Sequence, residues 1–383
     1  MEIKDNIIYE IDTILENFCI EGKITSVQPY GSGHINDTFC LINSSKNSPD
    51  YLLQRINHHV FKDVPSLMSN IDHVLLHLKY KILSDVYSNP DKNVITLIKT
   101  RQNLDFFKDQ EGNYWRMCLF LKDTKSYDLV TTNQQAMEGG KAFGRFQALL
   151  SDLDTNLLSE TIPDFHNIKK RLLAFNAAIT HDAFHRVNDV MTEINYVQSL
   201  SEDMCTIQQW GDEGKLPKRI THNDTKFNNI LFDQDDKAQC IIDLDTVMPG
   251  YVAFDFGDAI RTIINTRPED EQDLEKIELN IPLFKSFTHG YLNEVVEFLT
   301  PNEIKSLMLG VLLLPYMQGV RFLTDYLQGD TYFKTNFEGH NLQRAKAQFE
   351  LLRKLEVNSE VLKQIVSDAE FMYRKNIKSS IPN

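Results

Sequence analysis

The chain has 383 residues, of which 42% are hydrophobic, and it carries a formal net charge of −14. That length suffices for two domains with a sizeable core, and the acidic balance disfavours a nucleic-acid or anionic-membrane partner. The five cysteines show no metal-ligand spacing, which fits a reducing compartment. The N-terminus does not show the basic and then apolar pattern of a signal peptide, and no apolar run has membrane-spanning length. We therefore expect a cytoplasmic protein.

The first part of the chain predicts a small domain that mixes helix and strand. Apolar side chains at helical spacing predict helices over residues 6–19 and 63–83. The expected order of the main elements is three strands, one helix and two strands. The strands are expected over residues 24–30, 37–42, 50–56, 93–99 and 114–121.

From about residue 123 onward the sequence predicts a mainly helical domain. A strongly apolar helix is expected over 306–327, and a short hairpin around 232–236 interrupts the helices. We therefore expect an α+β fold with two domains, residues 1–122 and 123–383.

Two polar runs lie on either side of this hairpin. The first reads His-Asn-Asp-Thr-Lys-Phe-Asn-Asn over 222–229, and the second reads Ile-Ile-Asp-Leu-Asp over 241–245. In the first run Asp224 and Asn229 are five positions apart, which is the spacing of the base and a metal ligand in kinases. In the second run, Asp243 follows two apolar residues, as the metal-binding Asp of kinases does.

Phosphoryl transfer needs a carboxylate that orients and deprotonates the attacking hydroxyl, and oxygen ligands for Mg²⁺. Asp224 fits the first role, and Asn229 and Asp243 fit the second. Either run alone is also compatible with an ordinary turn, or with a strand that ends in a loop. Both runs in this order favour a kinase.

The two runs differ from those of protein kinases, which have His-Arg-Asp and Asp-Phe-Gly at these places. They point instead to the aminoglycoside phosphotransferase-like small-molecule kinases. Within that group, several segments resemble the bacterial N-acetylhexosamine 1-kinases. These segments are residues 30–39, 51–54, 221–226, 242–250, 255–261 and 321–333.

The resemblance implies a two-lobed, protein-kinase-like fold. Its small N-lobe, residues 1–122, would hold a five-stranded antiparallel sheet and bind the nucleotide. Its mainly helical C-lobe, residues 123–383, would carry the catalytic residues and bind the sugar. The implied reaction transfers phosphate from ATP, with Mg²⁺, to the anomeric hydroxyl of N-acetylglucosamine or N-acetylgalactosamine. The oligomeric state stays open.

A glycine loop lies between the first two expected strands. Backbone N–H groups of Gly31, Ser32 and Gly33 can face phosphate oxygens, and the Ser32 hydroxyl can add a donor. An ordinary hairpin turn is the competing interpretation. His34 can reach the phosphates or the sugar, or it is a structural histidine of the turn.

The usual strand lysine of kinases is missing. The third strand has Gln54 and Arg55 there, and their side chains point to opposite faces, so only one of them can face the nucleotide. Both alternatives stay open. The strand over 114–121 is expected to end as the hinge between the lobes, with backbone groups from Phe120 to Lys122 as adenine partners.

The resemblance suggests Arg321 and Tyr332 as sugar contacts. The alternatives are a salt bridge from Arg321 to Asp325 at i+4 and plain packing of Tyr332. Asp245 is expected on the same strand face as Asp243, where it is a metal or substrate-side ligand or bonds to the following turn.

Asp255 and Asp258 are expected to hold the loop after the metal-binding strand. Two other functions compete with the hexosamine kinase. One is another small-molecule kinase of this fold, acting on choline, homoserine, methylthioribose or an aminoglycoside. The other is a catalytically idle pseudokinase that serves as a scaffold.

Overall fold

The computed structural model describes residues 10–31, 35–83 and 89–380. The chain divides into two compact units, and each is described by itself. The first contains Met1–Thr124 and Asn156–Ile162, and the second contains Lys125–Thr155 and Pro163–Asn383. The expected assignment of nucleotide binding to residues 1–122 and of catalysis and sugar binding to 123–383 stays a prediction.

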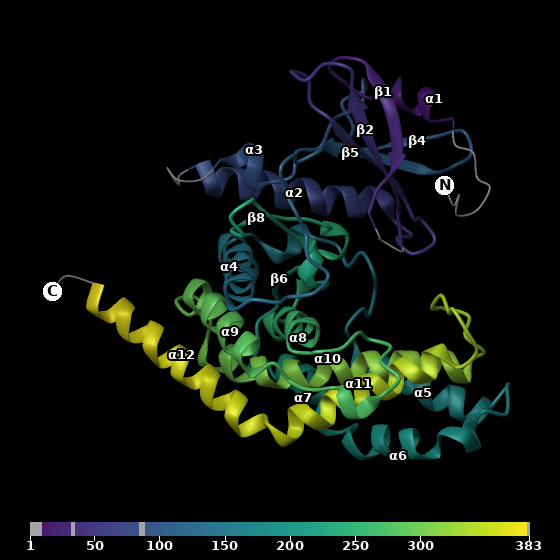
Figure 1. Cartoon of the computed structure of the whole chain (residues 1–383), viewed down its shortest axis with the longest axis vertical. Coiled ribbons are helices and arrows are strands. Elements are labelled where there is room, and N and C mark those ends of the chain that lie inside the picture. The colour runs from purple at the N-terminus through teal and green to yellow at the C-terminus, as the bar shows by residue number, and fades with distance from the viewer. Residues whose placement is uncertain (1–9, 32–34, 84–88, 381–383) are drawn as a thin grey trace. The chain divides into compact units, whose positions relative to one another are not determined.

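The first unit contains a five-stranded antiparallel sheet with the strand order β1-β2-β3-β5-β4, which confirms the predicted sheet (Figure 1). Its elements are α1 (Ile11–Leu15), β1 (Ile24–Pro29), β2 (Asp37–Asn43), β3 (Tyr51–Ile56), α2 (Val64–Leu83), α3 (Pro90–Asn93), β4 (Phe107–Lys108) and β5 (Tyr114–Leu119).

Two boundaries in this unit differ from the prediction. The first helix ends at Leu15 instead of residue 19, because Phe18 forms a β-bridge with Thr100; its expected start, residues 6–9, lies outside the described residues. The strand expected over 93–99 is reduced to one bridge between Leu97 and Cys118. Helix α3 precedes it and a turn at Thr100 follows, so the fifth strand of the sheet is β4.

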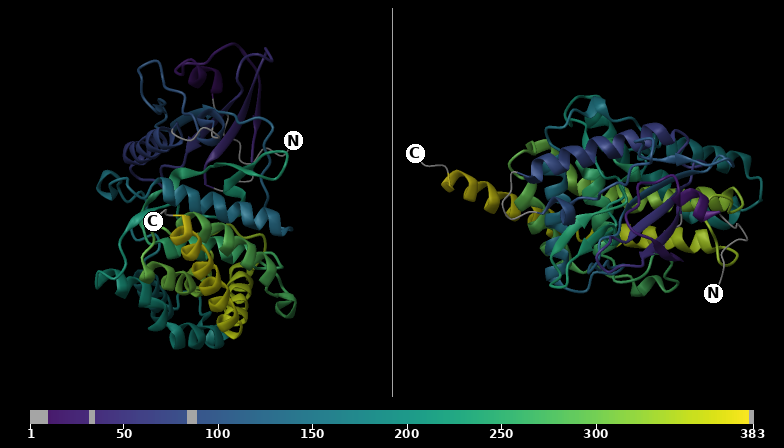
Figure 2. Two further views of the ribbon diagram at one scale, coloured as in Figure 1. Left: turned by 90° about the vertical axis from the view of Figure 1, so that its left-hand side faces the viewer. Right: turned by 90° about the horizontal axis from the view of Figure 1, so that it is seen from above.

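The second unit is mainly helical, as predicted, with three-residue and four-residue strands around the expected hairpin (Figure 1). Its strands are β6 (Arg219–Thr221), β7 (Ile230–Phe232), β8 (Ala238–Ile241) and β9 (Met248–Gly250). Its α-helices are α4 (Asn133–Leu149), α5 (Ile168–His181), α6 (Met191–Leu200), α7 (Thr206–Asp212), α8 (Val252–Ile263), α9 (Ile281–Val295), α10 (Pro301–Leu327), α11 (His340–Val357) and α12 (Ser359–Ser380). The last turns of α12 project from the rest of this unit (Figure 2, right).

Helix α10 is the central helix of the second unit and contains the apolar helix predicted over 306–327. A capping box starts it: the Thr300 side chain accepts from the backbone of Glu303, and the Glu303 side chain accepts from that of Thr300. By length and composition α10 can cross a membrane, but 72% of its most apolar window is buried inside the protein. It is therefore a core helix, and the cytoplasmic location stays a prediction.

Helices α8 and α10 pack with their backbones in close approach. A Cβ atom on Gly257 would collide with the carbonyl oxygen of Gly310, and one on Gly310 would collide with that of Ala253. Only glycine permits this spacing, which sets the polar side chains of α8 at a fixed distance from α10.

Candidate active site

A buried carboxylate on α8 holds the loop over 222–229. Strand β6 pairs with β9 and leads directly into this loop. Asp255, in the first turn of α8, accepts hydrogen bonds from the backbone N–H groups of His222 (2.9 Å) and Asn223 (2.7 Å). Burial raises the pKa of Asp255, although these donors act in the opposite sense. The Asp255 carboxylate thus contacts this loop and Gln147 of α4. The expected contact with the loop after the metal-binding strand is not seen among the described residues.

His222 connects the 222–229 loop with the second polar run. Its Nε2 donates to the carbonyl oxygen of Ile242 (3.0 Å), and its Nδ1 accepts from the backbone N–H of Asp224 (3.3 Å). Because a carbonyl only accepts and an amide only donates, the ring is neutral with its proton on Nε2. The rings of Phe143 and Phe146 pack edge-on against it. His222 is therefore a structural link.

Asn223 has a left-handed backbone conformation, with φ 65°, which asparagine tolerates well. Its Nδ2 donates to the carbonyl oxygen of Thr246 (2.9 Å), and its Oδ1 accepts from the Thr221 hydroxyl (3.0 Å). The residue that replaces the arginine of protein kinases is thus buried and shapes the backbone on which Asp224 sits.

Asp224 lies at the surface of this frame, with 24% of its side chain exposed. Lys226 places its Nζ 3.0 Å from Asp224 Oδ1, and Asn229 donates from Nδ2 to Asp224 Oδ2 (3.3 Å) and to its carbonyl oxygen (2.8 Å). Burial alone would raise the pKa of Asp224, but the positive charge and hydrogen bond of Lys226, together with other positive charge nearby, lower that pKa. In turn, the charge of Asp224 raises the pKa of Lys226. The pair is therefore a carboxylate beside a cation at neutral pH.

The β7–β8 hairpin brings Asn229 beside Asp243. Ile230 pairs with Ile241 in the register of the hairpin, and the backbone N–H of Ile242 donates to the carbonyl oxygen of Asn229 (2.9 Å). Asp243 follows at once, with φ 58° and an exposed side chain. Because Asp224 takes the N–H donors of the Asn229 amide, its Oδ1 is the atom that can ligate a cation.

The expectation for Asp245 is wrong in its geometry. Strand β8 ends at Ile241, and a short 3₁₀ helix covers Leu244–Thr246, so the strand alternation that put Asp245 on the face of Asp243 does not apply. Asp245 is buried, whereas Asp243 is exposed. Among the described residues no group of three or more His, Cys, Asp or Glu can hold a metal. A kinase-type Mg²⁺ site needs fewer protein ligands, since phosphate oxygens of the nucleotide complete the coordination.

Arg321 on α10 does not form the salt bridge with Asp325 that competed with a sugar contact. Its Nη1 donates to Gln318 Oε1 (3.1 Å), and its guanidinium lies over the ring of Phe333, 5.3 Å from the centroid. Within the described part of the chain it has no ion pair. Arg321 is thus a cation whose position is fixed by neutral groups.

Asp325 instead shapes the turn that carries the other predicted sugar contact. Its carboxylate accepts from the backbone N–H groups of Thr331, Tyr332 and Phe333, at 2.8 to 2.9 Å. The Tyr332 side chain is 70% exposed, and its ring meets the edge of Phe333. Tyr332 therefore presents an accessible ring close to Arg321 through their shared neighbour.

Two residues near this turn were missed by the sequence analysis. His166 Nε2 donates to the carbonyl oxygen of Asn223 (3.1 Å), and enclosure by the protein lowers its pKa to about 4, so it is neutral at pH 7. Arg171 on α5 donates to the carbonyl oxygen of Phe165 (3.1 Å), and its Nε is buried without a partner in the described part of the chain. Burial, and then the charge of Arg321, lowers the pKa of Arg171. No sequence motif marks them. Packing of α5 against α10 brings Arg171 here, and His166 lies just before the start of α5.

The sheet of the first unit separates Gln54 from Arg55. Arg55 lies on the same face of β3 as Tyr51 and Leu53, which belong to the core around α1, and it pairs with Asp37 at 2.6 Å.

Gln54 lies on the opposite face, where its Oε1 accepts from Arg116 Nε (2.9 Å) and its Nε2 donates to Thr38 (3.2 Å). The buried Arg116 is a cation on this face that the sequence analysis did not single out. Its position inside an otherwise apolar strand was the available signal.

The other predicted nucleotide contacts also lie in the first unit. Gly31 has φ 81° at the end of β1, whereas Ser32, Gly33 and His34 lie outside the described residues. The backbone N–H of Phe120 donates to the carbonyl oxygen of Asp50 (2.9 Å), and Lys122 forms an ion pair with the Asp50 carboxylate (2.8 Å). The nucleotide-binding roles of these residues stay predictions.

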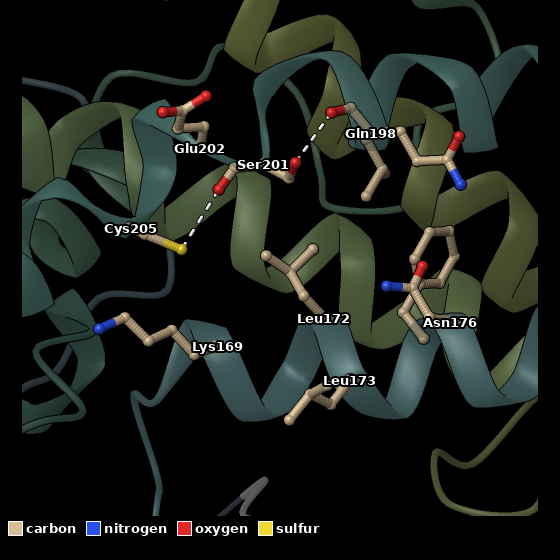
Figure 3. Close-up of a pocket in the computed structure, with 10 residues that line it drawn as sticks. Lys169, Leu172, Leu173, Asn176, Gln198, Ser201, Glu202 and Cys205 are labelled. Atoms are coloured by element: carbon tan, nitrogen blue, oxygen red, sulfur yellow. Dashed lines mark hydrogen bonds between the residues drawn. The ribbon is translucent and has the colours of Figure 1, made fainter.

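A pocket of about 380 Å³ lies in the second unit between α5, α6 and the residues that follow α6 (Figure 3). Leucines of α5 line one side, and Gln198, Ser201 and Cys205 line the other. None of its lining residues belongs to the predicted site.

The fold and the Asp224–Lys226–Asn229 arrangement define a kinase-like phosphotransferase. The sequence profile described as "Phosphotransferase enzyme family" matches residues 26–286. The chain belongs to this family and has the aminoglycoside phosphotransferase-like kinase fold, as predicted. Its class is therefore that of the small-molecule kinases.

Solved structures share this fold at low sequence identity. An aminoglycoside phosphotransferase from Alicyclobacillus acidocaldarius is 10% identical, with a TM-score of 0.57 over 97% of this chain and 98% of that one. The amicoumacin kinase hAmiN, in complex with AMP-PNP, Ca²⁺ and Ami, is 10% identical, with a TM-score of 0.57 over 90% and 94%. An ethanolamine kinase from Plasmodium vivax is 16% identical, with a TM-score of 0.51 over 85% and 82%.

Proposed function

We propose that the chain transfers the γ-phosphate of ATP to the anomeric hydroxyl of an N-acetylhexosamine, N-acetylglucosamine or N-acetylgalactosamine. The family supplies the reaction type. The resemblance of residues 321–333 and 242–250 to N-acetylhexosamine 1-kinases supports the substrate. The positive charges of Arg321 and Arg171, which have no ion pair among the described residues, support a neutral acceptor independently.

In the proposed mechanism Asp224 orients the 1-hydroxyl and takes its proton as the oxygen attacks the γ-phosphorus in line. The lowered pKa of Asp224 keeps it ionised, ready to accept. Lys226, 3.0 Å away, offers positive charge for the transferred phosphate. Asn229 and Asp243 would hold Mg²⁺, which neutralises phosphate charge when bound. An amide oxygen and an exposed carboxylate are ligands that suit this ion.

For the nucleotide, we propose that Gly31, Ser32 and Gly33 cover the phosphates. We further propose that Gln54 and Arg116 together replace the missing strand lysine, since Arg116 is the cation on the face of Gln54. Phe120 and Lys122 remain the proposed adenine-side residues.

The observation that carries the acceptor class is the pair of arginines near the 222–229 loop. Arg321 and Arg171 have no ion pair among the described residues, and each lowers the pKa of the neutral His166 that bonds to Asn223. Choline, ethanolamine and aminoglycosides carry positive charge, which such a site repels. Guanidinium groups only donate, so they suit the carbonyl and hydroxyl oxygens of a neutral N-acetylated sugar. We therefore propose Arg321 and Tyr332 as sugar contacts, as the resemblance implies, and we keep His34 and Asp245 as further candidates on the sugar side.

A coupled assay for ADP tests the acceptor class. N-acetylglucosamine and N-acetylgalactosamine should be turned over, whereas choline, ethanolamine, homoserine, methylthioribose and an aminoglycoside should not. The product should be a glycosyl 1-phosphate that mild acid hydrolyses. An acid-stable phosphate, or turnover confined to an amino alcohol, would assign the chain to another member of the fold. Absence of turnover with every acceptor would support the idle scaffold.

Variants at the sugar side sharpen this test. Arg321→Lys and Tyr332→Phe should raise the KM for the hexosamine while the KM for ATP stays nearly fixed. Arg344→Lys is the matched control. Arg344 lies on the neighbouring helix α11, and its guanidinium is also over a phenylalanine ring, 5.5 Å from the centroid of Phe322. A change confined to the ATP constant would contradict the sugar-side placement.

A further inference from the structure

Asp258 lies one helical turn after Asp255 on α8 and is only 6% exposed. Residues three apart on a helix share a face, so Asp258 lies on the side of α8 that faces the 222–229 loop. The Asp255 carboxylate accepts hydrogen bonds from the backbone of that loop. Asp258 makes no such backbone contact within the described residues.

The two oxygens of Asp258 differ. Oδ1 accepts from Arg261 Nε (3.2 Å) and Nη2 (3.0 Å), whereas Oδ2 is buried and has no hydrogen-bond partner among the described residues. A buried carboxylate oxygen without a donor is costly, because water no longer solvates it. Native proteins keep such an atom where something else donates to it.

The surroundings of Asp258 are those of the proposed acceptor site. The charge of Asp258 adds to that of Asp224 in raising the pKa of Lys226. It also favours the protonated form of His166, against the larger effect of burial, and His166 donates to Asn223. Asp258 is thus close enough to interact electrostatically with Lys226 in the loop that carries Asp224, and with His166, which bonds to the same loop. Arg261 balances the charge of Asp258 and also pairs with Glu269 (2.8 Å).

We propose that Asp258 Oδ2 accepts a hydrogen bond from a ring hydroxyl of the acceptor sugar other than the one that is phosphorylated. Asp258 is then a specificity-determining residue, which favours a polyol over an acceptor with a single hydroxyl. This inference rests on the proposed function, since it assumes that the acceptor lies beside Asp224.

Asp258→Asn tests the inference, because the amide keeps one oxygen for Arg261 and places an NH₂ donor where Oδ2 was. The matched control is Glu269→Gln, which weakens the other ion pair of Arg261 at a side chain that is 41% exposed. Asp258→Asn should raise the KM for the hexosamine by about tenfold or more, while the KM for ATP stays within about twofold. Glu269→Gln should leave both constants within about twofold.

The 3-, 4- and 6-deoxy analogues of the sugar separate binding from structure. With the wild-type enzyme one analogue should bind about tenfold or more weakly than the parent sugar, and Asp258→Asn should abolish that difference. Equal losses in both variants, or the same loss on every analogue, would overturn the inference. If Asp258→Asn does not fold, wild-type affinities that are equal for all analogues overturn it on their own.

Failure of the proposed function is distinguishable. If the wild-type enzyme turns over a different acceptor, the same comparison is made with that acceptor and with versions that each lack one donor group. A selective loss that disappears in Asp258→Asn supports the role of Asp258, and its absence refutes it.

Discussion

Asp255→Ala should destabilise the second unit and disable the enzyme, although Asp255 touches neither substrate in our proposal. The carboxylate accepts from the backbone N–H groups of His222 and Asn223 and from Gln147 Nε2 at 2.7 Å. In the alanine variant both backbone donors stay buried, because the surrounding loop is enclosed and water has no access to them.

The magnitude follows from those two donors. Each buried N–H that loses its partner costs about 1–3 kcal/mol, which gives roughly 2–6 kcal/mol for the pair. Part of this cost is offset in the alanine variant. Burial raises the pKa of Asp255, which means that the buried charge is unfavourable, and the variant no longer has to desolvate it. We therefore expect a net loss of about 2–4 kcal/mol in the free energy of unfolding. Asp255→Asn, which keeps one acceptor oxygen, should lose about half as much.

Urea unfolding followed by tryptophan fluorescence and by circular dichroism measures this loss. Asp235→Ala is the control, since Asp235 is exposed in the β7–β8 hairpin, and it should change stability by less than about 0.5 kcal/mol. The kcat of Asp255→Ala should also fall, because Asp224 sits on the released loop. If Asp255→Ala unfolds at the same urea concentration as Asp235→Ala, the two hydrogen bonds do not hold the loop.

Three further predictions concern the chemistry. Asp224→Asn should fold and bind ATP normally but lower kcat by about 100-fold or more, and near-normal turnover would reject it as the base. Asp243→Ala should weaken Mg·ATP far more than metal-free ATP in calorimetry, and equal losses would argue against a metal ligand. Lys226→Met should move the acid limb of kcat/KM to higher pH, because the lowered pKa of Asp224 rises when burial acts without the cation. An unchanged limb, with the same substrates for both enzymes, would show that Lys226 does not set this pKa.

Much of the fold could be predicted because local patterns and tertiary structure agree. The apolar stripe over 63–83 is the buried face of α2, and the pattern over 306–327 lies within α10. The polar runs were informative for another reason. A short hairpin fixes the register of its two ends, so the positions of Asn229 and Asp243 in the sequence already imply that their backbones lie at the same end of the hairpin.

The errors lie where tertiary contacts override local preference. Residues 93–99 are rich in β-branched side chains, but β5 offers them a single bridge before the chain turns. Asp245 was placed by strand alternation, which ends when Asp243 adopts φ 58°. Whether Gln54 or Arg55 lies opposite the α1 core depends on which face of the sheet α1 covers, and no local pattern contains that information.

The charges of the second unit reconcile an acidic protein with an anionic substrate. The net charge of −14 would repel ATP at long range, but salt screens such repulsion beyond about 8 Å at physiological ionic strength. In the proposed site, the charges that ATP and the acceptor would meet are local: Lys226 beside Asp224, and Arg171 and Arg321 without ion pairs among the described residues. Two of the acidic side chains near the loop have defined partners, since Asp255 accepts from the backbone of the loop and Asp258 Oδ1 pairs with Arg261. If the acceptor binds there, as we propose, these unpaired cations favour a neutral acceptor over a positively charged one.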